Sequence, residues 1–548
     1  MFGLAVTALI LQALAAAAEP KWTQLVRTVN ASGAQALELL ADAPAPAWLS
    51  ADFEAAFTVE VDATSLFQVV HGFGGAFTEA AGLNFLNLSL ADRARVATLL
   101  FDPEDGIGYS TGRLPMGSAD FALNDYSLDN GCDGKNSPDP GLACFDDTMA
   151  RDSANGVIAL MQAAVAAAKA GGRDGFPRIF MCPWSPPAWM KLPDAHGISM
   201  SGTASPNGLN ATFNASLAAY FSRYASAVES KLGMPLWGYS LQNEPTATAG
   251  WPSCKWQPEA ARDYLRDFML PVMQRDHPGM NLLIFDHNYD AAYDWAQVLY
   301  ADATVRAGAW GLAAHWYASP GQVSNLNLTH QAFPDKHILH TEGCLCNAPS
   351  GGRVVLPGDP AWFGLGESYG FGVISVLQNF GEGCKFASHT KSPSSGRNRL
   401  LTVIPYPLRL TVTDWNVLLS APGGGPFHER PFSCNAPMIQ KSGELILQSP
   451  YYVLGQFSKF FVPGTQIVGA MHYAGASAPQ PLGKFVYQTT LAASSPFGVL
   501  AGVTPNGTSV LLVMNAQGTE VSFKLMIQNS AYANVTVPAH SISTFSWY

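Results

Sequence analysis

Short apolar segments alternate with longer stretches rich in Ala and Leu along most of this chain, from about His71 to Trp415. The short segments have the length of buried strands, and the longer stretches have the length of helices. Sustained alternation of this kind predicts a parallel α/β fold, and a count of eight strands favours a (β/α)8 TIM barrel. The expected strands are 73–78, 109–114, 179–183, 237–242, 282–286, 311–315, 337–341 and 411–415, and expected helices include 153–170, 215–232 and 258–274.

A doubly wound sheet is the alternative to the barrel. Such a sheet would carry a glycine-rich phosphate loop at the start of a helix. The run His71-Gly-Phe-Gly-Gly-Ala does not have the spacing of that loop. The barrel is therefore the preferred prediction.

Both ends of the chain follow a different pattern. Residues 22–61 contain short alternating apolar segments, which predict strands. From about Ser449 no further helix is expected, and the short segments there predict an all-β sandwich that the N-terminal strands join. These segments are 485–490, 509–514, 521–526 and 541–547. The expected division is a signal peptide (1–18), N-terminal strands of the sandwich (19–68), the barrel (69–448) and the C-terminal sandwich (449–548).

The N-terminus has the pattern of a secretory signal. Residues 4–18 are apolar and end in small residues, so cleavage is expected near Ala18. The alternative is a buried or membrane-anchoring segment; no later run reaches the roughly 18–20 apolar residues of a membrane span. Glycosylation sequons add weight to a secretory route, either to the lysosome or vacuole or to the cell exterior. They begin at Asn30, Asn87, Asn210, Asn214, Asn327, Asn506 and Asn534.

Composition narrows the possible ligands. The net charge is −11, so the chain has no general attraction to nucleic acid. Eight cysteines are too few for a disulfide scaffold, although Cys132 and Cys144 flank a loop rich in Gly, Pro and Asp that a disulfide would close. Cys344 and Cys346 lack the usual spacing of zinc ligands. We therefore expect neither a metal site nor a cofactor.

Two glutamates stand at the ends of predicted strands. Glu244 follows the fourth strand and Glu342 ends the seventh, and these strands stand across the barrel mouth from each other. Glycosidic cleavage requires two facing carboxyl groups, about 5–5.5 Å apart when the anomeric configuration is retained. Asn243 is placed to bind a sugar 2-hydroxyl, and aromatic neighbours are expected to raise the pKa of Glu244.

Other strand ends carry residues suited to a sugar site. These are Asp120, Trp184 and Trp189 in Cys182–Lys191, His315 and Tyr317 in His-Trp-Tyr, and Asn416 in Thr-Asp-Trp-Asn. Each has a plainer interpretation. Asn-Glu-Pro often begins a helix, the tryptophans suit a hydrophobic core, and His315 suits a hydrogen-bonded core histidine. The joint arrangement at successive strand ends favours the catalytic interpretation.

Taken together, these motifs resemble the glucosylceramidases of glycoside hydrolase family 30. The resemblance rests on His-Gly-Phe-Gly-Gly-Ala-Phe-Thr-Glu, Arg-Leu-Pro-Met, Pro-Trp-Ser-Pro-Pro-Ala-Trp, Gln-Asn-Glu-Pro, His-Trp-Tyr, Thr-Glu-Gly-Cys, Thr-Asp-Trp-Asn and Gly-Gln-Phe-Ser-Lys-Phe, in order over residues 69–464. It implies a barrel with a β-sandwich, and retaining hydrolysis of glucosylceramide to glucose and ceramide.

The resemblance also implies roles for individual residues. Glu244 is the implied acid/base and Glu342 the implied nucleophile, while Cys344 resembles an unpaired pocket cysteine. The implied glucose-site residues are Asp120, Trp184, Asn243, Tyr317 and Asn416, and Trp251 and His315 are expected to contact the substrate as well. A lipid substrate implies contact with a membrane surface, with a saposin-like activator as a further possible partner.

The chain departs from the family at three places. Trp251 stands where a tyrosine is expected, and Ser253 where a phenylalanine is, so the aromatic lid is matched only in part. Val412 replaces a tryptophan before Thr-Asp-Trp-Asn. Residues 383–411 are basic, unlike the rest of the chain, and we interpret them as an insertion, either translated non-coding sequence or a natural surface loop.

Two rival functions remain open. One is another family-30 activity, such as a β-1,6-glucanase, β-xylosidase or endoxylanase. The other is a catalytically inactive protein that binds carbohydrate or lipid.

Overall fold

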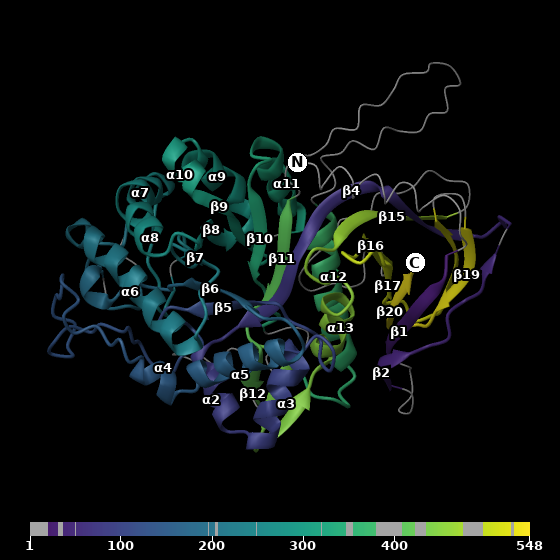
Figure 1. The fold of residues 1–548 in the computed structure, drawn as a ribbon, viewed down its shortest axis with the longest axis horizontal. Coiled ribbons are helices and arrows are strands. Elements are labelled where there is room, and N and C mark those ends of the chain that lie inside the picture. Colours follow the sequence, from purple (N-terminus) through teal and green to yellow (C-terminus); the bar gives the residue numbers. More distant parts are fainter. Residues whose placement is uncertain are drawn as a thin grey trace, which may run out of the picture.

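The computed structural model has a barrel beside a β-sandwich (Figure 1). The described residues are 20–30, 37–49, 51–194, 197–202, 207–247, 249–318, 320–346, 355–379, 408–421, 434–474, 497–527 and 531–548. The predicted signal peptide at 1–18 and the predicted strand at 485–490 lie outside them.

Eight parallel strands form the barrel. Each pairs with the next, and the last pairs with the first and closes the ring. The predicted TIM barrel is therefore confirmed. The strands are β4 (Phe57–Ala76), β5 (Thr111–Pro115), β6 (Arg178–Cys182), β7 (Gly238–Ser240), β8 (Asn281–Asn288), β9 (Ala309–His315), β10 (His337–Glu342) and β11 (Arg409–Asp414).

Helices follow the strands and cover the outside of the barrel (Figure 1). They are α2 (Glu79–Leu86), α3 (Leu90–Phe101), α4 (Ala150–Ala154), α5 (Val157–Ala170), α6 (Asn214–Leu232), α7 (Pro258–Tyr264), α8 (Leu270–Asp276), α9 (Ala292–Tyr300), α10 (Ala303–Gly308), α11 (Ser324–Ala332) and α12 (Trp362–Asn379). The helix expected at 258–274 contains a π-helical turn, Leu265–Met269, between α7 and α8.

The single helix expected at 153–170 is wrong. It divides into α4 and α5 at Gly156, which has a left-handed φ of 88°. A side chain there would also meet the carbonyl oxygen of Gly82 at 2.5 Å. The break therefore lets α2 approach closely.

The sandwich combines strands from both chain ends, as predicted. β1 pairs with β20, and the ring of Trp22 on β1 stacks on Trp48 of β3 at 4.3 Å, so β3 packs against β1 although the two strands do not pair. The strands are β1 (Trp22–Asn30), β2 (Leu37–Asp42), β3 (Trp48–Leu49), the first half of β4, β15 (Gln466–Ala474), β16 (Phe497–Val503), β17 (Ser509–Asn515), β18 (Val521–Ile527), β19 (Ala531–Val537) and β20 (Ser541–Trp547). A separate small sheet contains β12 (Leu418–Ser420), β13 (Met438–Lys441) and β14 (Glu444–Leu447).

The expectation that helices end at about Ser449 is wrong, because α13 (Ser449–Ser458) begins there. It lies between the barrel and the sandwich and is buried on nearly every side, so it lacks the polar face that marks a surface helix. Its Gln456 bonds to Thr28 of β1 at 3.1 Å and to Thr544 of β20 at 2.7 Å. The helix therefore contacts two neighbouring strands of the sandwich, one from each end of the chain.

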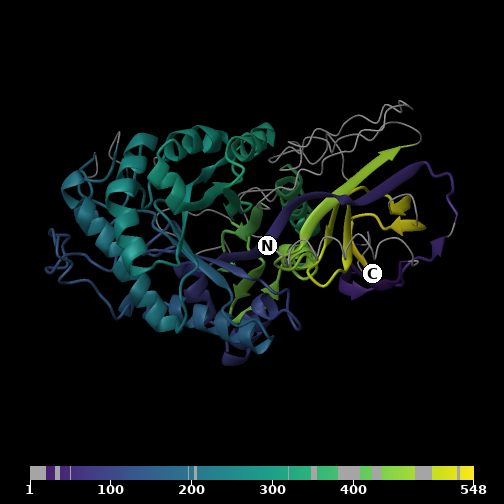
Figure 2. The same ribbon diagram turned by 45° about the horizontal axis from the view of Figure 1, so that its top comes forward.

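Strand β4 belongs to both parts of the molecule (Figure 2). Its first half pairs with β15 and β18 in the sandwich, and its second half pairs with β5 and β11 in the barrel. The strand expected at 73–78 is only its last portion.

The proposed insertion at 383–411 lies mostly outside the described residues. Its expected end is wrong, because Arg409–Thr411 pair with β4 as part of the eighth barrel strand. Any inserted segment must therefore end before Arg409.

Replacing Gly74 with Ala is expected to destabilise the barrel. A Cβ there would lie 2.0 Å from the backbone oxygen of Thr111, its partner on β5. The two strands would have to separate, so we expect urea unfolding to show a loss of about 1–3 kcal/mol or more. Gly141→Ala is the control, since no atom lies within 4 Å of its added Cβ. Equal stability of the two variants would contradict the expectation.

Candidate active site

A fully buried arginine, Arg113 on β5, lies at the centre of the site. Its Nη2 donates to Oδ1 of Asn243 at 2.8 Å and to Oδ2 of Asp286 at 2.9 Å, and its Nη1 donates to Glu342. The guanidinium also lies 4.7 Å from the ring of Trp184. A buried charge requires partners, so Arg113 fixes side chains on β8 and β10 and on the segments that follow β6 and β7.

His315, the last residue of β9, lies among three carboxylates. Its Nε2 is 3.0 Å from Asp286, and its Nδ1 is 3.3 Å from Oε1 of Glu244 and 4.0 Å from Oε1 of Glu342. Because both Oε1 atoms lie this close to one nitrogen, they are no farther apart than the sum of 3.3 and 4.0 Å. The separation of about 5–5.5 Å that a retaining pair requires falls within this limit. The carboxyl groups predicted at the fourth and seventh strand ends do face the same point.

Glu342 is contacted by donors at both oxygens. Arg113 donates to Oε2, and the hydroxyl of Tyr317 donates to Oε1 at 3.0 Å. The same hydroxyl lies 3.3 Å from the thiol of Cys344. With 7% of its side chain exposed, Glu342 depends on these donors rather than on water.

Glu244 has different neighbours. Its Oε1 lies 3.5 Å from Nδ1 of His287, besides the contact with His315, and 18% of its side chain is exposed. Its backbone has a left-handed φ of 45°, and its N–H donates to the carbonyl of Asp286 at 2.9 Å. This strained conformation occurs at the point where the chain leaves β7 and turns Glu244 toward the site.

An irregularity in β8 brings two consecutive side chains into the site. Phe285 and Asp286 have φ of 75° and 70°, and the pairing with β9 shifts register between Phe285 and His287. Such bulges redirect side chains that would otherwise alternate between the two faces. Asp286 thus accepts hydrogen bonds from Ser240 and Thr341, while His287 reaches Glu244.

The titratable groups of the site lie close enough together to shift one another's pKa values. Burial disfavours a charged His315, but Glu342, Asp286 and Glu244 outweigh it and raise its pKa to about 9. Burial raises the pKa of Glu342, against the opposing effects of His315 and Arg113. Burial acts on Glu244 in the same direction, but the interactions with His287 and His315 outweigh it and lower that pKa. The expected raised pKa of Glu244 is therefore not found, because histidines surround it instead of aromatic rings.

Three predicted polar residues lie in or beside this network. Asn243 binds Arg113, and Asp120 lies close enough to both glutamates for their charges, after burial, to raise its pKa. Asn416 is buried, and its Oδ1 accepts from Thr78 at 2.7 Å. Within the described residues, Oδ1 of Asp120 and Nδ2 of Asn416 are buried and have no hydrogen-bond partner.

The predicted tryptophans are less exposed than a sugar platform requires. Trp184 is 2% exposed, and its ring stacks on Trp415 at 4.8 Å. Trp189 is buried against Phe213, which makes it a core residue. Trp251 is partly exposed and packs against the cluster that contains Trp184.

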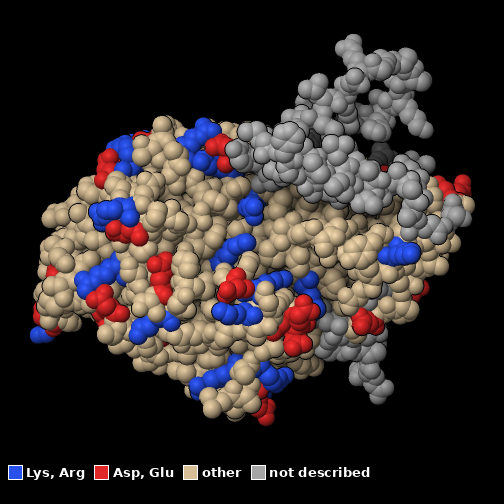
Figure 3. All heavy atoms as spheres, viewed as in Figure 1, with Lys and Arg blue, Asp and Glu red and all other residues tan. Residues whose placement is uncertain are grey.

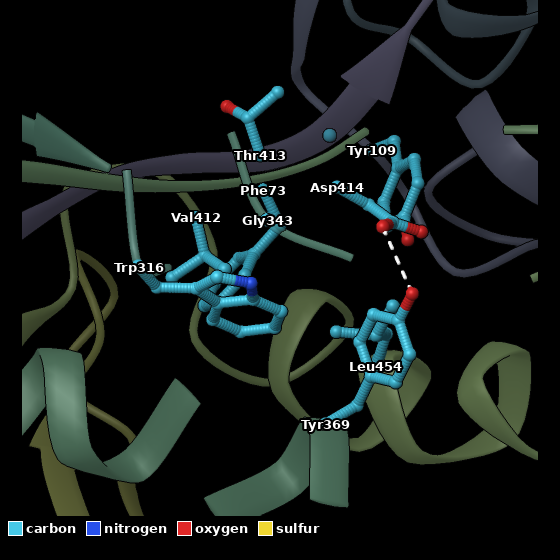
Figure 4. Close-up of a pocket in the computed structure, with 10 residues that line it drawn as sticks. Phe73, Tyr109, Trp316, Gly343, Tyr369, Val412, Thr413, Asp414 and Leu454 are labelled. Carbon is cyan, nitrogen blue, oxygen red and sulfur yellow. Dashed lines mark hydrogen bonds between the residues drawn. The ribbon is translucent and has the colours of Figure 1, made fainter. Parts of the chain in front are cut away.

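A small cavity lies behind the site, on the outer side of β11 (Figure 4). Val412, Trp316 and Gly343 line it, and the hydroxyl of Tyr369 donates across it to Asp414 at 3.2 Å. Position 412 is where the resemblance leads us to expect a tryptophan. The smaller valine leaves this space open next to the backbone that follows Glu342.

Sequence reasoning missed Arg113, Asp286 and His287 as site residues. A signal for the first two was present, because a charged residue within an apolar barrel strand must be paired when buried. No pattern pointed to His287, since its position depends on the bulge in β8.

The predicted disulfide between Cys132 and Cys144 is present in the structure. A second disulfide, which was not predicted, joins Cys346 to Cys434, and Cys344 is unpaired. Among the sequons, Asn87, Asn506 and Asn534 are exposed, whereas Asn210 and Asn214 are half-buried. Asn327 is buried on α11, where a glycan would displace its packing.

Comparison with known proteins identifies relatives over most of the chain. Residues 70–380 match the model of the glycosyl hydrolase family 30 TIM-barrel domain, and residues 488–545 match that of the family's beta sandwich domain. The lysosomal acid glucosylceramidase of Mus musculus is 27% identical over 490 residues, covering 88% of this chain and 81% of the mouse protein. The endo-1,6-beta-D-glucanase BGN16.3 of Trichoderma harzianum is 25% identical over 492 residues, covering 87% and 84%.

Solved structures share the fold. SrfJ from Salmonella typhimurium superposes with a TM-score of 0.75 at 23% identity, covering 96% of this chain and 99% of SrfJ. The endo-beta1,6-glucanase BT3312 superposes with a TM-score of 0.70 at 19% identity, with the same coverage.

The barrel, the sandwich and the facing carboxyl groups define a glycoside hydrolase. More particularly, the chain belongs to glycosyl hydrolase family 30.

Charges on the visible face are mixed. Lys and Arg side chains lie beside Asp and Glu in small groups over both parts of the molecule (Figure 3). Within the described ranges, no helix is both long and apolar enough to cross a membrane.

Proposed function

We propose that this enzyme hydrolyses a β-glucoside with retention of configuration, with Glu342 as the nucleophile and Glu244 as the acid/base. The contacts of Glu342 carry this assignment. Arg113 and Tyr317 donate hydrogen bonds to Glu342 and so favour its ionised form. The ionised carboxylate is the form that attacks the anomeric carbon. The partners of Glu244 are histidines, which both donate and accept protons.

The proton on the acid/base has a nearby source. While His315 is charged, it holds Glu244 ionised; moving one proton from Nδ1 to Oε1, over 3.3 Å, protonates Glu244 and leaves His315 neutral. Protonated Glu244 then donates to the leaving oxygen as Glu342 forms the glycosyl-enzyme bond. In the second step Glu244 takes a proton from water, the water attacks the anomeric carbon, and the Glu342 ester is released.

Glucosylceramide is the substrate that we propose. The similarity to the mouse lysosomal acid glucosylceramidase over most of both chains supports this substrate. The sequence motifs that resemble those of the family-30 glucosylceramidases support it as well. A lipid substrate fits the proposed secretory route to a lysosome, vacuole or cell exterior, and contact with a membrane surface, with or without a saposin-like activator. A β-1,6-glucan is the second candidate, supported by the Trichoderma relative.

The test is hydrolysis of a substrate panel by the purified full chain at about pH 5, where carboxyl groups and histidines both titrate. The panel contains glucosylceramide in mixed micelles, β-1,6-glucan, and aryl β-glucoside and β-xyloside, each beside Glu342→Gln. We expect glucosylceramide and the aryl glucoside to be cleaved. Cleavage of the glucan alone would transfer the assignment to a glucanase, and inactivity on every substrate would favour a binding protein.

Replacing His287 with Asn is expected to shift the pH dependence of this activity. His287 helps to lower the pKa of Glu244, so without it Glu244 keeps its proton to higher pH. The alkaline limb of kcat/KM should therefore move to higher pH, since that limb reports the acid of the free enzyme. His277→Asn is the matched control, because His277 contacts Glu229 at 3.4 Å on the outside of the barrel. A shift to lower pH in His287→Asn, or an equal shift in both variants, would contradict the expectation.

A further inference from the structure

Glu244, His287 and His315 turn three metal-binding atoms toward one point. Oε1 of Glu244 lies 3.5 Å from Nδ1 of His287 and 3.3 Å from Nδ1 of His315, and all three atoms lie within 4.8 Å of one another. Glu244 comes from the segment that follows β7, and the two histidines come from β8 and β9, the next two strands of the barrel. Two imidazoles and one carboxylate are a donor set that zinc sites with an open position use.

The spacing of these atoms suits a tetrahedral ion. Zinc binds imidazole nitrogen at about 2.0–2.1 Å and carboxylate oxygen at about 2.0–2.2 Å, which places neighbouring tetrahedral ligands about 3.3–3.4 Å apart. The contacts of Glu244 with His315 and His287, at 3.3 and 3.5 Å, already have that separation. The two imidazole nitrogens lie within 4.8 Å of each other, so this is the pair that would draw together to accept an ion.

The surroundings support the ligands as they do in metal sites. Nε2 of His315 faces Asp286 at 3.0 Å, and Arg113, Ser240 and Thr341 hold that carboxylate in place. A carboxylate behind a histidine fixes the orientation of the ring and directs the other nitrogen toward the ion.

His287 itself points to a missing ligand. Its side chain is about nine-tenths buried, and Nδ1 forms no hydrogen bond of good geometry within the described structure. A buried nitrogen of this kind usually has a partner. Glu244 is 18% exposed, so an ion has a route to the three atoms from the substrate side.

We propose that Glu244, His287 and His315 form a binding site for a divalent transition-metal ion, foremost zinc, and that the bound ion inhibits hydrolysis. The ion would bind Oε1 of Glu244, which is the oxygen through which this residue exchanges its proton. The inhibition rests on the proposed role of Glu244 as acid/base, whereas the binding does not. The cluster of Cys344, Cys346 and Cys434 is a poorer site, because two of its three sulfurs form a disulfide.

Zn²⁺ binding is tested directly on the metal-stripped full chain by titration calorimetry, with Co²⁺ absorption as an optical probe. We expect one ion per chain, with affinity at least tenfold lower in His287→Asn. His277→Asn is the control and should bind as the wild type does, because His277 has a glutamate neighbour but belongs to no group of three ligands within the described residues. Zn²⁺ should also slow aryl β-glucoside cleavage over the concentration range in which it binds, and EDTA should restore the rate.

Several results would overturn the proposal. They are the absence of stoichiometric binding, equal binding by His287→Asn and the wild type, and binding that is lost in Cys344→Ser instead. Binding without inhibition of an active enzyme would refute the inhibitory effect. Binding that depends on His287 in a protein without activity would support the metal site and contradict the proposed hydrolase function, which keeps the two failures distinct.

Discussion

Glu342→Gly is expected to lower the hydrolysis of an aryl β-glucoside by at least about 10³-fold, because removing a nucleophile abolishes the covalent route. The residue lies at the end of β10 between Arg113 and Tyr317, and neither partner can replace it. Azide is small enough for the vacated space. It should restore turnover and attack from the nucleophile's side, which yields the α-glucosyl azide.

Glu244→Ala provides the matched comparison. With an activated aryl leaving group this variant still forms the glycosyl-enzyme, and azide then attacks from the opposite face and yields the β-glucosyl azide. The configuration of the two products, read by NMR, therefore distinguishes the roles. A β-azide from Glu342→Gly would reverse the assignment.

Arg113→Met is expected to cost about 3–5 kcal/mol of stability and nearly all activity. The substitution leaves the buried carboxylate of Asp286 and that of Glu342 without their shared cation, and an uncompensated buried charge is strongly destabilising. Urea unfolding measures the stability, and the aryl glucoside measures the activity.

The control for Arg113 is Arg306→Met. Arg306 pairs with Asp335 at 2.7 Å, but both side chains are more than two-fifths exposed, so we expect a loss below about 1 kcal/mol and unchanged activity. A similar loss of stability in both variants would show that the loss in Arg113→Met is not due to the burial of Arg113. Full activity in a folded Arg113→Met would remove it from the site.

The barrel was predictable because each strand has its own local signal. The apolar runs ending at His315 and Glu342 have the length of buried strands, and their polar ends mark the catalytic edge of any such barrel. Strand order placed the two glutamates at opposed strand ends, whereas their catalytic roles also rested on the other strand-end motifs and on the family resemblance. The helix α13 was not predicted, because it is buried on nearly every side and lacks the polar face that marks a surface helix.

The finer structure of the site depends on backbone irregularities that have no sequence pattern here. His287 reaches Glu244 only because β8 bulges at Phe285 and Asp286, two non-glycine residues with left-handed φ. The stacking of Trp184 on Trp415 likewise depends on contacts between distant segments. Because of those contacts, the ring of Trp184 is buried, whereas an exposed ring was expected to pack on a sugar.

The shared strand β4 has a consequence for protein engineering. Removing the C-terminal residues from Gln466 onward would take β15 and β18 away from the first half of β4, and expose a long, extended edge on both sides. Unprotected edges of this kind recruit strands from other chains and promote aggregation. The barrel is therefore not a module that can be excised and fused elsewhere. A transplanted version of this catalytic unit must carry the sandwich with it, as one indivisible part.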